Sequence, residues 1–153
     1  MAPLLIERGV IEIPASHEPP LLPAVGQLGE HYRKHLLGTE RSAPALRARL
    51  HDLLIDACDE PVADKRVHLP GIFASLGGAD TAVIESGQFW MLVAMAPRDL
   101  RIAAYVRDAH GVIMTVCSCW MRGPGWGRGE LWVESGPYNR PYRWGAGCTF
   151  ATR

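Results

Sequence analysis

The chain has 153 residues, of which 48% are hydrophobic, and its mean hydropathy is −0.01. This length and composition suffice for one ordinary hydrophobic core, and they exclude a disordered or fibrous protein. We therefore expect a single domain over residues 1–153. The longest apolar run, residues 89–96, is far shorter than the roughly 20 residues that a membrane-spanning helix needs, and the N-terminus lacks the layout of a secretory signal. The sequence thus predicts a cytoplasmic protein without a membrane partner.

Charge is balanced over the whole chain but not along it. Lys and Arg number 16, as do Asp and Glu, so the formal net charge is zero. Residues 1–100 hold nine basic and thirteen acidic side chains, whereas residues 101–153 hold seven and three. The positive charges of the second part are all arginines. An acidic N-terminal part and a basic C-terminal part are therefore expected.

Residues 1–60 are predicted to begin with a proline-rich lead-in and to continue as helix. Residues 4–13 alternate weakly, which favours an edge strand, and the prolines that follow keep the lead-in, residues 1–24, extended. Residues 25–60 are predicted to be helical, with helices at about 25–37 and 43–59, because apolar residues recur at helical spacing. The residues that carry this spacing are Val25, Leu28, Tyr32 and Leu36 in the first helix and Leu46, Leu50, Leu53, Leu54 and Ala57 in the second.

Residues 80–153 are predicted to be mainly antiparallel sheet and loops. Short runs rich in β-branched and aromatic residues, separated by turn-forming residues, favour strands. The expected strands are residues 81–85, 88–96, 101–107, 112–120, 130–134 and 148–152. The fold that follows is α+β, with two N-terminal helices packed on a twisted antiparallel sheet and a Gly/Trp-rich C-terminal region.

Two histidines in the first predicted helix form the most informative motif. Positions i and i+4 of a helix share a face, so His31 and His35 are expected to point the same way, with Arg33 and Lys34 beside them. An unperturbed imidazole titrates near neutral pH, and a neighbouring cation stabilises a phosphate. The motif therefore suits proton transfer beside a phosphate, although two histidines on an exposed helix face are also typical of ordinary solvated surface.

Arginines and aromatic residues alternate in the C-terminal region. Guanidinium and aromatic planes can stack on bases and bind phosphates, as in RNA-binding surfaces. Alternatively, the aromatic side chains fix a Gly- and Pro-rich loop region against the core, with solvated arginines at its rim. The candidate RNA-binding residues are Arg33, Arg122, Trp126, Arg128, Arg140 and Arg143.

The four cysteines lack the spacing of a disulfide framework or of a zinc finger. Cys117 and Cys119 are two residues apart, so on a strand both thiols would project from one face. We interpret the cysteines as small buried or half-buried apolar residues, while a zinc site built from these thiols and the two helical histidines stays open. We predict no metal and no cofactor.

The order of these parts resembles the superfamily of small metal-independent endoribonucleases that includes barnase, colicin-type tRNA-cleaving toxins and RelE-type toxins, particularly its toxin and phage-borne branches. The resemblance rests on residues 31–35, a second helix, and a hairpin over residues 108–115 that ends in Thr115. It covers residues 25–120 as a layout. In this sequence, residues 36–38 replace the glycine that usually follows the second histidine directly, and the region from 120 onward has no counterpart.

This resemblance implies attack of a ribose 2′-hydroxyl on the adjacent phosphodiester. His31 and His35 would serve as base and acid, Lys34 or Arg33 would stabilise the developing negative charge, and Thr115 would donate a hydrogen bond to the phosphate. RNA is the partner that this chemistry implies.

The competing hypothesis is a non-catalytic binding or assembly module. Its acidic and basic parts are complementary, so copies can associate head to tail or bind another protein, with Trp and Arg of the C-terminal region as interface anchors. A small-molecule pocket under the aromatic side chains is a third possibility, because α+β folds often hold ligands there.

Overall fold

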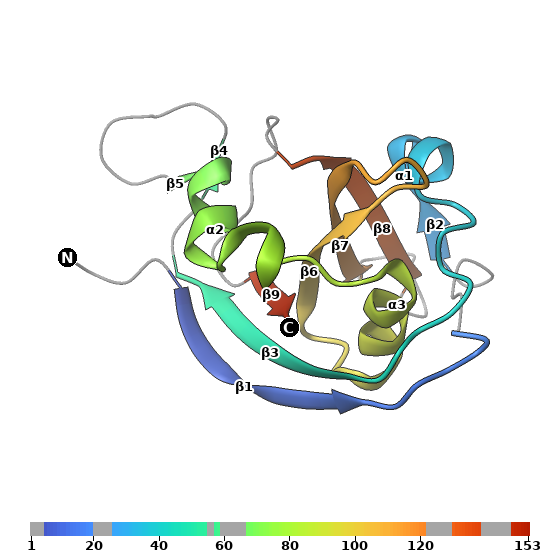
Figure 1. The fold of residues 1–153 in the computed structure, drawn as a ribbon, viewed down its shortest axis with the longest axis horizontal. Coiled ribbons are helices and arrows are strands. Elements are labelled where there is room, and N and C mark those ends of the chain that lie inside the picture. The colour runs from blue at the N-terminus through green and yellow to red at the C-terminus, as the bar shows by residue number, and fades with distance from the viewer. Residues whose placement is uncertain (1–4, 20–25, 55–56, 59–66, 122–129, 139–147) are drawn as a thin grey trace.

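The computed structural model of the chain describes residues 5–19, 26–54, 57–58, 67–121, 130–138 and 148–153. Strands dominate these residues, and the helices are short (Figure 1). In chain order the elements are β1 (Leu5–Ile13), β2 (Gly26–Leu28), α1 (Glu30–His35), β3 (Leu46–Leu53), β4 (Ala57–Cys58), β5 (Val67–His68), α2 (Leu69–Ser75), η1 (Gly78–Asp80), α3 (Ser86–Met95), β6 (Arg101–Arg107), β7 (Ile113–Met121), β8 (Glu130–Pro137) and β9 (Cys148–Thr152).

Seven of the described strands form one mixed sheet in the order β1-β3-β9-β6-β7-β8-β2. The pairs β6/β9 and β2/β8 are parallel and the other neighbours are antiparallel. β4 and β5 form a separate two-stranded parallel pair. In Figure 1, β1 and β3 run along one edge of the molecule, while α1 lies beside β8 and β2 at the other.

Helices cover both faces of the central strand β6, which explains why five consecutive residues of β6 are buried. Ile102, Ala104 and Val106 pack in a core with side chains of α1 and α3, whereas Ala103 and Tyr105 face a second core with side chains of α2. Since successive residues of a strand point to opposite faces, the two cores lie on opposite sides of the sheet.

The predicted fold of two N-terminal helices packed on a twisted antiparallel sheet is wrong. The second predicted helix, residues 43–59, contains strand β3, which pairs antiparallel with β1 and β9. The first, residues 25–37, contains a strand as well as a shorter helix, Glu30–His35. The leucines of β3 fit helical spacing, but Leu46, Ala48 and Leu50 also alternate with exposed arginines, as in a strand. Hydrogen bonding of β3 to β1 on one edge and to β9 on the other stabilises the strand.

The prediction of a strand at residues 88–96 is also wrong, because residues 88–95 belong to α3 and Ala96 is its C-cap. A short apolar run fits a buried strand and a buried helix equally well. The helical alternative is favoured by a capping box, in which the Glu85 side chain accepts from the N3 backbone and the Gln88 side chain accepts from the backbone N–H of Glu85. Residues 81–85 contribute only an isolated bridge between Val83 and Tyr105. The strands predicted near 4–13, 101–107, 112–120, 130–134 and 148–152 correspond to β1, β6, β7, β8 and β9.

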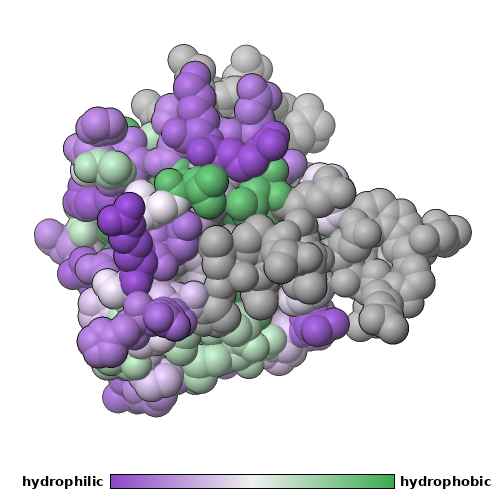
Figure 2. Space-filling model, turned by 90° about the vertical axis from the view of Figure 1, so that its right-hand side faces the viewer, coloured by the Kyte–Doolittle hydropathy of each residue, from purple (hydrophilic) through white to green (hydrophobic). Residues whose placement is uncertain are grey.

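The surface on the α1 side is largely hydrophilic. Figure 2 shows this side of the molecule, with a strongly hydrophobic patch near the centre, paler green residues below it, and hydrophilic residues over most of the remaining coloured surface. No helix in the described part of the chain is long and apolar enough to cross a membrane.

Candidate functional site

The short helix α1 is held against β8 at the edge of the sheet. β2 pairs parallel with β8, and the backbone N–H of Gly29, directly before α1, donates to the carbonyl of Val133 at 2.8 Å. A side chain at Gly29 would crowd Glu134, since a Cβ there would lie 3.3 Å from its Cγ. Tyr32 and Leu36 are fully buried in the core beneath the helix. These contacts fix which side of α1 faces outward.

The hydroxyl of Tyr32 anchors the buried side of α1. It donates to Glu40 Oε2 at 2.9 Å and accepts the indole N–H of Trp90, on α3, at 2.7 Å. The other oxygen of Glu40 accepts the backbone N–H of Gly38 at 2.8 Å. Burial, first of all, raises the pKa of Tyr32 far above its ordinary value, so the hydroxyl stays neutral. The network ties α1, the following turn and α3 into one unit.

His31 and His35 lie in contact on the outward side of α1. Their ring centroids are 4.3 Å apart and the rings are tilted by 40°. Nδ1 of His31 lies 2.6 Å from Oγ of Ser135 on β8. The two imidazoles open into a pocket of about 400 Å³ between α1 and β8, whose lining residues are Gly29, Glu30, His31, Lys34, His35, Glu134 and Ser135.

Electrostatics at this pocket favour a neutral His31. Burial lowers its pKa most, and the nearby charges of His35 and Lys34 lower it further. A neutral imidazole carries a lone pair on one nitrogen and a proton on the other, so it can accept a proton at neutral pH. His31 therefore has the properties of a general base.

Asp108 lies in the turn between β6 and β7, directly after the last residue of β6. Its carboxylate accepts the backbone N–H of His110 at 2.8 Å and of Val112 at 2.9 Å. Burial acts to raise the pKa of Asp108, but these hydrogen bonds outweigh it, and the charges of His110 and His35 lower the pKa further. The electrostatic influence of His35 on Asp108 places α1 near this hairpin.

Thr115 is not brought together with the histidines. Its hydroxyl is buried and donates to the carbonyl of Gly136 at 3.1 Å. Its strand neighbours Met114 and Val116 belong to the core that contains α1, so Thr115 points to the opposite face of the sheet. The side chain that the sheet presents to His31 is instead Ser135, which pairs with Val116.

The predicted cations differ in their placement. Lys34 lines the pocket, whereas Arg33 is exposed on α1 and does not line it. Arg122, Trp126, Arg128, Arg140 and Arg143 lie outside the described residues.

Sequence reasoning missed four residues that line the pocket, namely Gly29, Glu30, Glu134 and Ser135. Glu134 and Ser135 are about one hundred residues from α1 in the chain, and no local motif marks them. Only the parallel pairing of β2 with β8 brings them to the histidines. No group of three or more His, Cys, Asp or Glu side chains in the described ranges is placed to hold a metal ion.

Comparison with known proteins does not assign this site. No protein-family model matches the chain, and neither the curated proteins nor the solved structures contain a match. The function is therefore argued from the geometry of the site alone.

Proposed function

We propose that the pocket between α1 and β8 cleaves RNA without a metal ion, by attack of a ribose 2′-hydroxyl on the adjacent phosphodiester. The observation that carries this proposal is the contact between His31 and His35, with His31 hydrogen-bonded to Ser135 and Lys34 in the same pocket. The bond from O2′ to phosphorus forms, the bond from phosphorus to O5′ breaks, and a 2′,3′-cyclic phosphate results.

His31 is the general base in this scheme. When Ser135 Oγ accepts the proton on Nδ1, the lone pair on Nε2 is left to accept the proton of the 2′-hydroxyl. Because burial and the nearby positive charges lower the pKa of His31, this lone pair is available at neutral pH. Ser135 is thus a positioning residue that orients the imidazole of His31.

His35 is the general acid and Lys34 the electrostatic stabiliser. His35 gives its proton to O5′ as the bond to phosphorus breaks, and the ammonium group of Lys34 offsets the negative charge that grows on the phosphorane oxygens. Two imidazoles in contact disfavour double protonation, which suits a pair in which one ring accepts a proton and the other donates one.

The charges around the pocket favour a phosphodiester over a phosphomonoester. Glu30 and Glu134 line the same pocket as Lys34, and two carboxylates repel a dianion more strongly than a monoanion. A phosphodiester carries one negative charge, and a pocket of about 400 Å³ lies in the range that holds small ligands. One nucleotide of a single strand fits this description.

Cleavage of single-stranded RNA in excess chelator tests the proposal. His31→Ala, His35→Ala and Lys34→Ala should each lower the rate by roughly a hundredfold or more, as expected for lost proton transfer or charge stabilisation. Arg33→Ala is the matched control, since it removes a positive charge from the same helix outside the pocket. Thr115→Val should leave the rate unchanged, and Ser135→Ala should lower it by about tenfold while shifting the pH profile.

Intact RNA after prolonged incubation, across several substrates including tRNA, would contradict the proposal. A non-catalytic assembly module would then be the better account. It predicts that Trp126→Ala or Arg128→Ala abolishes association while the three pocket variants have no effect.

A further inference from the structure

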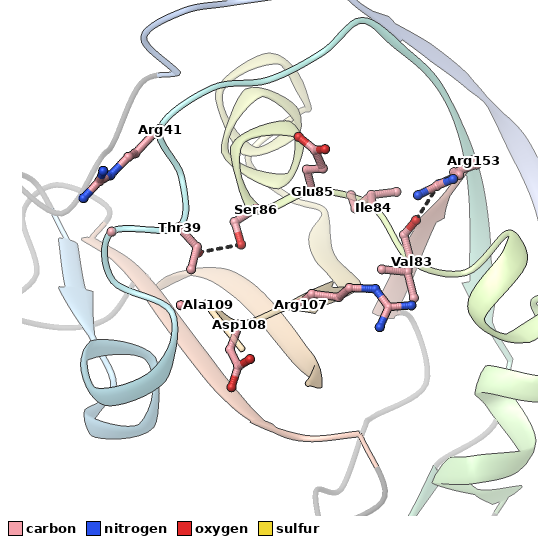
Figure 3. Close-up of a pocket in the computed structure, with 11 residues that line it drawn as sticks. Thr39, Arg41, Val83, Ile84, Glu85, Ser86, Arg107, Asp108, Ala109 and Arg153 are labelled. Atoms are coloured by element: carbon pink, nitrogen blue, oxygen red, sulfur yellow. Dashed lines mark hydrogen bonds between the residues drawn. The ribbon is translucent and has the colours of Figure 1, made fainter. Parts of the chain in front are cut away.

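A second and larger pocket lies at the other end of the turn that follows α1. Its volume is about 640 Å³, and it is lined by Gly38, Thr39, Arg41, residues 83–86 at and before the start of α3, residues 107–109 and Arg153 (Figure 3). None of the residues of the histidine pocket lines it. The two pockets are therefore separate sites.

Two arginines are held alongside the same segment of this pocket. Nε of Arg153 donates to the carbonyl of Val83 at 2.8 Å, and Val83 forms a bridge with Tyr105, two residues before Arg107 on β6. Nη1 of Arg107 donates to the carbonyl of Gly111 at 2.9 Å. In Figure 3 both side chains lie on the side of the pocket where Val83 is found, whereas Arg41 points away on the opposite side.

Each backbone contact orients a guanidinium group without neutralising it. An arginine has five N–H donors, and each of these hydrogen bonds to a carbonyl uses one of them. Within the described part of the chain, neither Arg107 nor Arg153 forms an ion pair. Two like charges thus stand beside one segment with donors left for an anion.

The two carboxylates of the pocket are already hydrogen-bonded to backbone N–H groups. Glu85 accepts from the first turn of α3, and Asp108 accepts from His110 and Val112. Figure 3 shows the Glu85 and Asp108 carboxylates directed away from the guanidinium groups of Arg107 and Arg153. The two carboxylates keep their negative charges, but among the described residues neither of them forms an ion pair with Arg107 or Arg153.

The hydroxyl groups in the pocket are engaged with each other. Oγ1 of Thr39 lies 2.6 Å from the carbonyl oxygen of Leu36 and 2.9 Å from Oγ of Ser86. Recognition of an anion thus depends on the guanidinium groups of Arg107 and Arg153. A carboxylate offers two oxygens, enough for one guanidinium fork, whereas a phosphate offers enough oxygens for two.

We propose that Arg107 and Arg153 bind a phosphate group in this pocket. The phosphate belongs to a small nucleotide or to the backbone of a single-stranded RNA, since both present the same oxygens to the guanidinium groups. Phosphate binding at this site does not depend on proton transfer at His31 and His35, so it can be tested independently of the proposed cleavage.

Calorimetry with three probes tests this site: inorganic phosphate, adenosine 5′-monophosphate and a 2′-O-methyl oligonucleotide that cannot be cleaved. Arg107→Gln and Arg153→Gln should each weaken binding of every probe that binds by about tenfold or more, the usual effect of losing a charge-assisted hydrogen bond. Arg107→Lys should give an intermediate loss, because lysine keeps the charge but not the fork. Arg49→Gln, on β3 and outside both pockets, is the matched control and should bind within twofold of the original protein.

A second measurement keeps the test independent of how the variants fold. In the unaltered protein, the side-chain Nε–H signals of Arg107 and Arg153 should shift on addition of phosphate while that of Arg49 stays in place. In His31→Ala the signals of Arg107 and Arg153 should shift on addition of phosphate as they do in the original protein, which separates this site from the catalytic proposal. If the oligonucleotide binds much more tightly than adenosine 5′-monophosphate, the phosphate belongs to a nucleic-acid strand. If the two bind with equal affinity, the natural ligand is a small nucleotide.

Two results would overturn the proposal. One is the failure of all three probes to bind at millimolar concentration. The other is an equal loss of binding in Arg49→Gln and in the two pocket variants, which would indicate general electrostatic attraction and no defined site.

Discussion

The imidazole of His31 and the hydroxyl of Ser135 lie 2.6 Å apart although 104 positions separate them in the chain. This contact joins the outward side of α1 to β8, while Tyr32 joins its buried side to α3. A six-residue helix has too few internal hydrogen bonds to be stable by itself. Tertiary contacts on both sides therefore hold the two histidines in place.

The protonation of His31 should depend on its neighbours. Because burial, His35 and Lys34 lower its pKa, we expect an NMR titration midpoint below the ordinary value of about 6.5. Lys34→Gln and His35→Asn should each raise this midpoint, since each removes a positive charge. Arg33→Gln, the control on the same helix, should raise it less. A midpoint at or above the ordinary value would contradict the electrostatic account.

The lowered pKa of His31 should also make the folding stability depend on pH. The folded-state pKa of His31 lies below that of the unfolded chain, so the unfolded state binds the proton more readily. The contribution of His31 to stability is therefore present above the unfolded pKa and is lost as the pH falls through the folded pKa. Urea unfolding of His31→Asn between about pH 4 and 8 should give a weaker loss of stability toward acid than the original protein.

Removal of the hydroxyl group should destabilise the protein at Tyr32 but not at Tyr105. Tyr32→Phe leaves the Trp90 indole N–H and the Glu40 carboxylate without their shared partner, so it should lower the free energy of unfolding by about 1–3 kcal/mol. The hydroxyl of Tyr105 is buried with no hydrogen-bond partner in the described part of the chain. Tyr105→Phe should therefore be neutral or slightly stabilising. Equal losses in the two variants on chemical denaturation would show that the network does not anchor α1.

The strands of the C-terminal half could be predicted because their patterns are local. β6 and β7 are runs of β-branched and aromatic residues separated by Asp108 to Gly111, which form a turn. β3 could not be predicted in the same way, because its leucines fit two periodicities and its partners β1 and β9 lie far away in sequence. Tertiary pairing decided what the local pattern left open.

In the candidate site, too, some features follow from local sequence and others depend on tertiary pairing. The shared face of His31 and His35 follows from their spacing in a helix, and the ring contact agrees with it. The roles expected of Thr115 and Ser135 depend on which face of the sheet each side chain occupies. That face is set by the register of β7 against β8, which pairs Thr115 with Gly136 and Val116 with Ser135. No short-range pattern in the sequence determines this register.

Gly87 should tolerate no side chain. It is buried in the first turn of α3, and a Cβ at this position would collide with the backbone carbonyl of Ser42 and approach Cγ of Pro19 to 3.1 Å. Backbone atoms cannot move aside as the end of a long side chain can, so Gly87→Ala should lower the free energy of unfolding by roughly 3 kcal/mol. Gly38→Ala is the control, because only left-handed backbone conformation opposes it and its loss should be about 1–2 kcal/mol. A smaller loss for Gly87→Ala than for Gly38→Ala in urea unfolding would refute this packing argument.

Cys117 and Cys148 should remain thiols under mild oxidation although their sulfur atoms are 4.0 Å apart. They lie on β7 and β9, with β6 between these two strands. A disulfide bond is only about 2.05 Å long, so its formation would require the two sulfur atoms to approach each other across β6. The hydrogen bond with Cys148, followed by burial, also raises the pKa of Cys117, which leaves little of the reactive thiolate. After treatment of the folded protein with oxidised glutathione, mass spectrometry of its peptides should show no Cys117–Cys148 link, and Cys148→Ser should oxidise like the original protein. Recovery of that linked pair in high yield from folded protein would mean that β6 moves out from between the two strands.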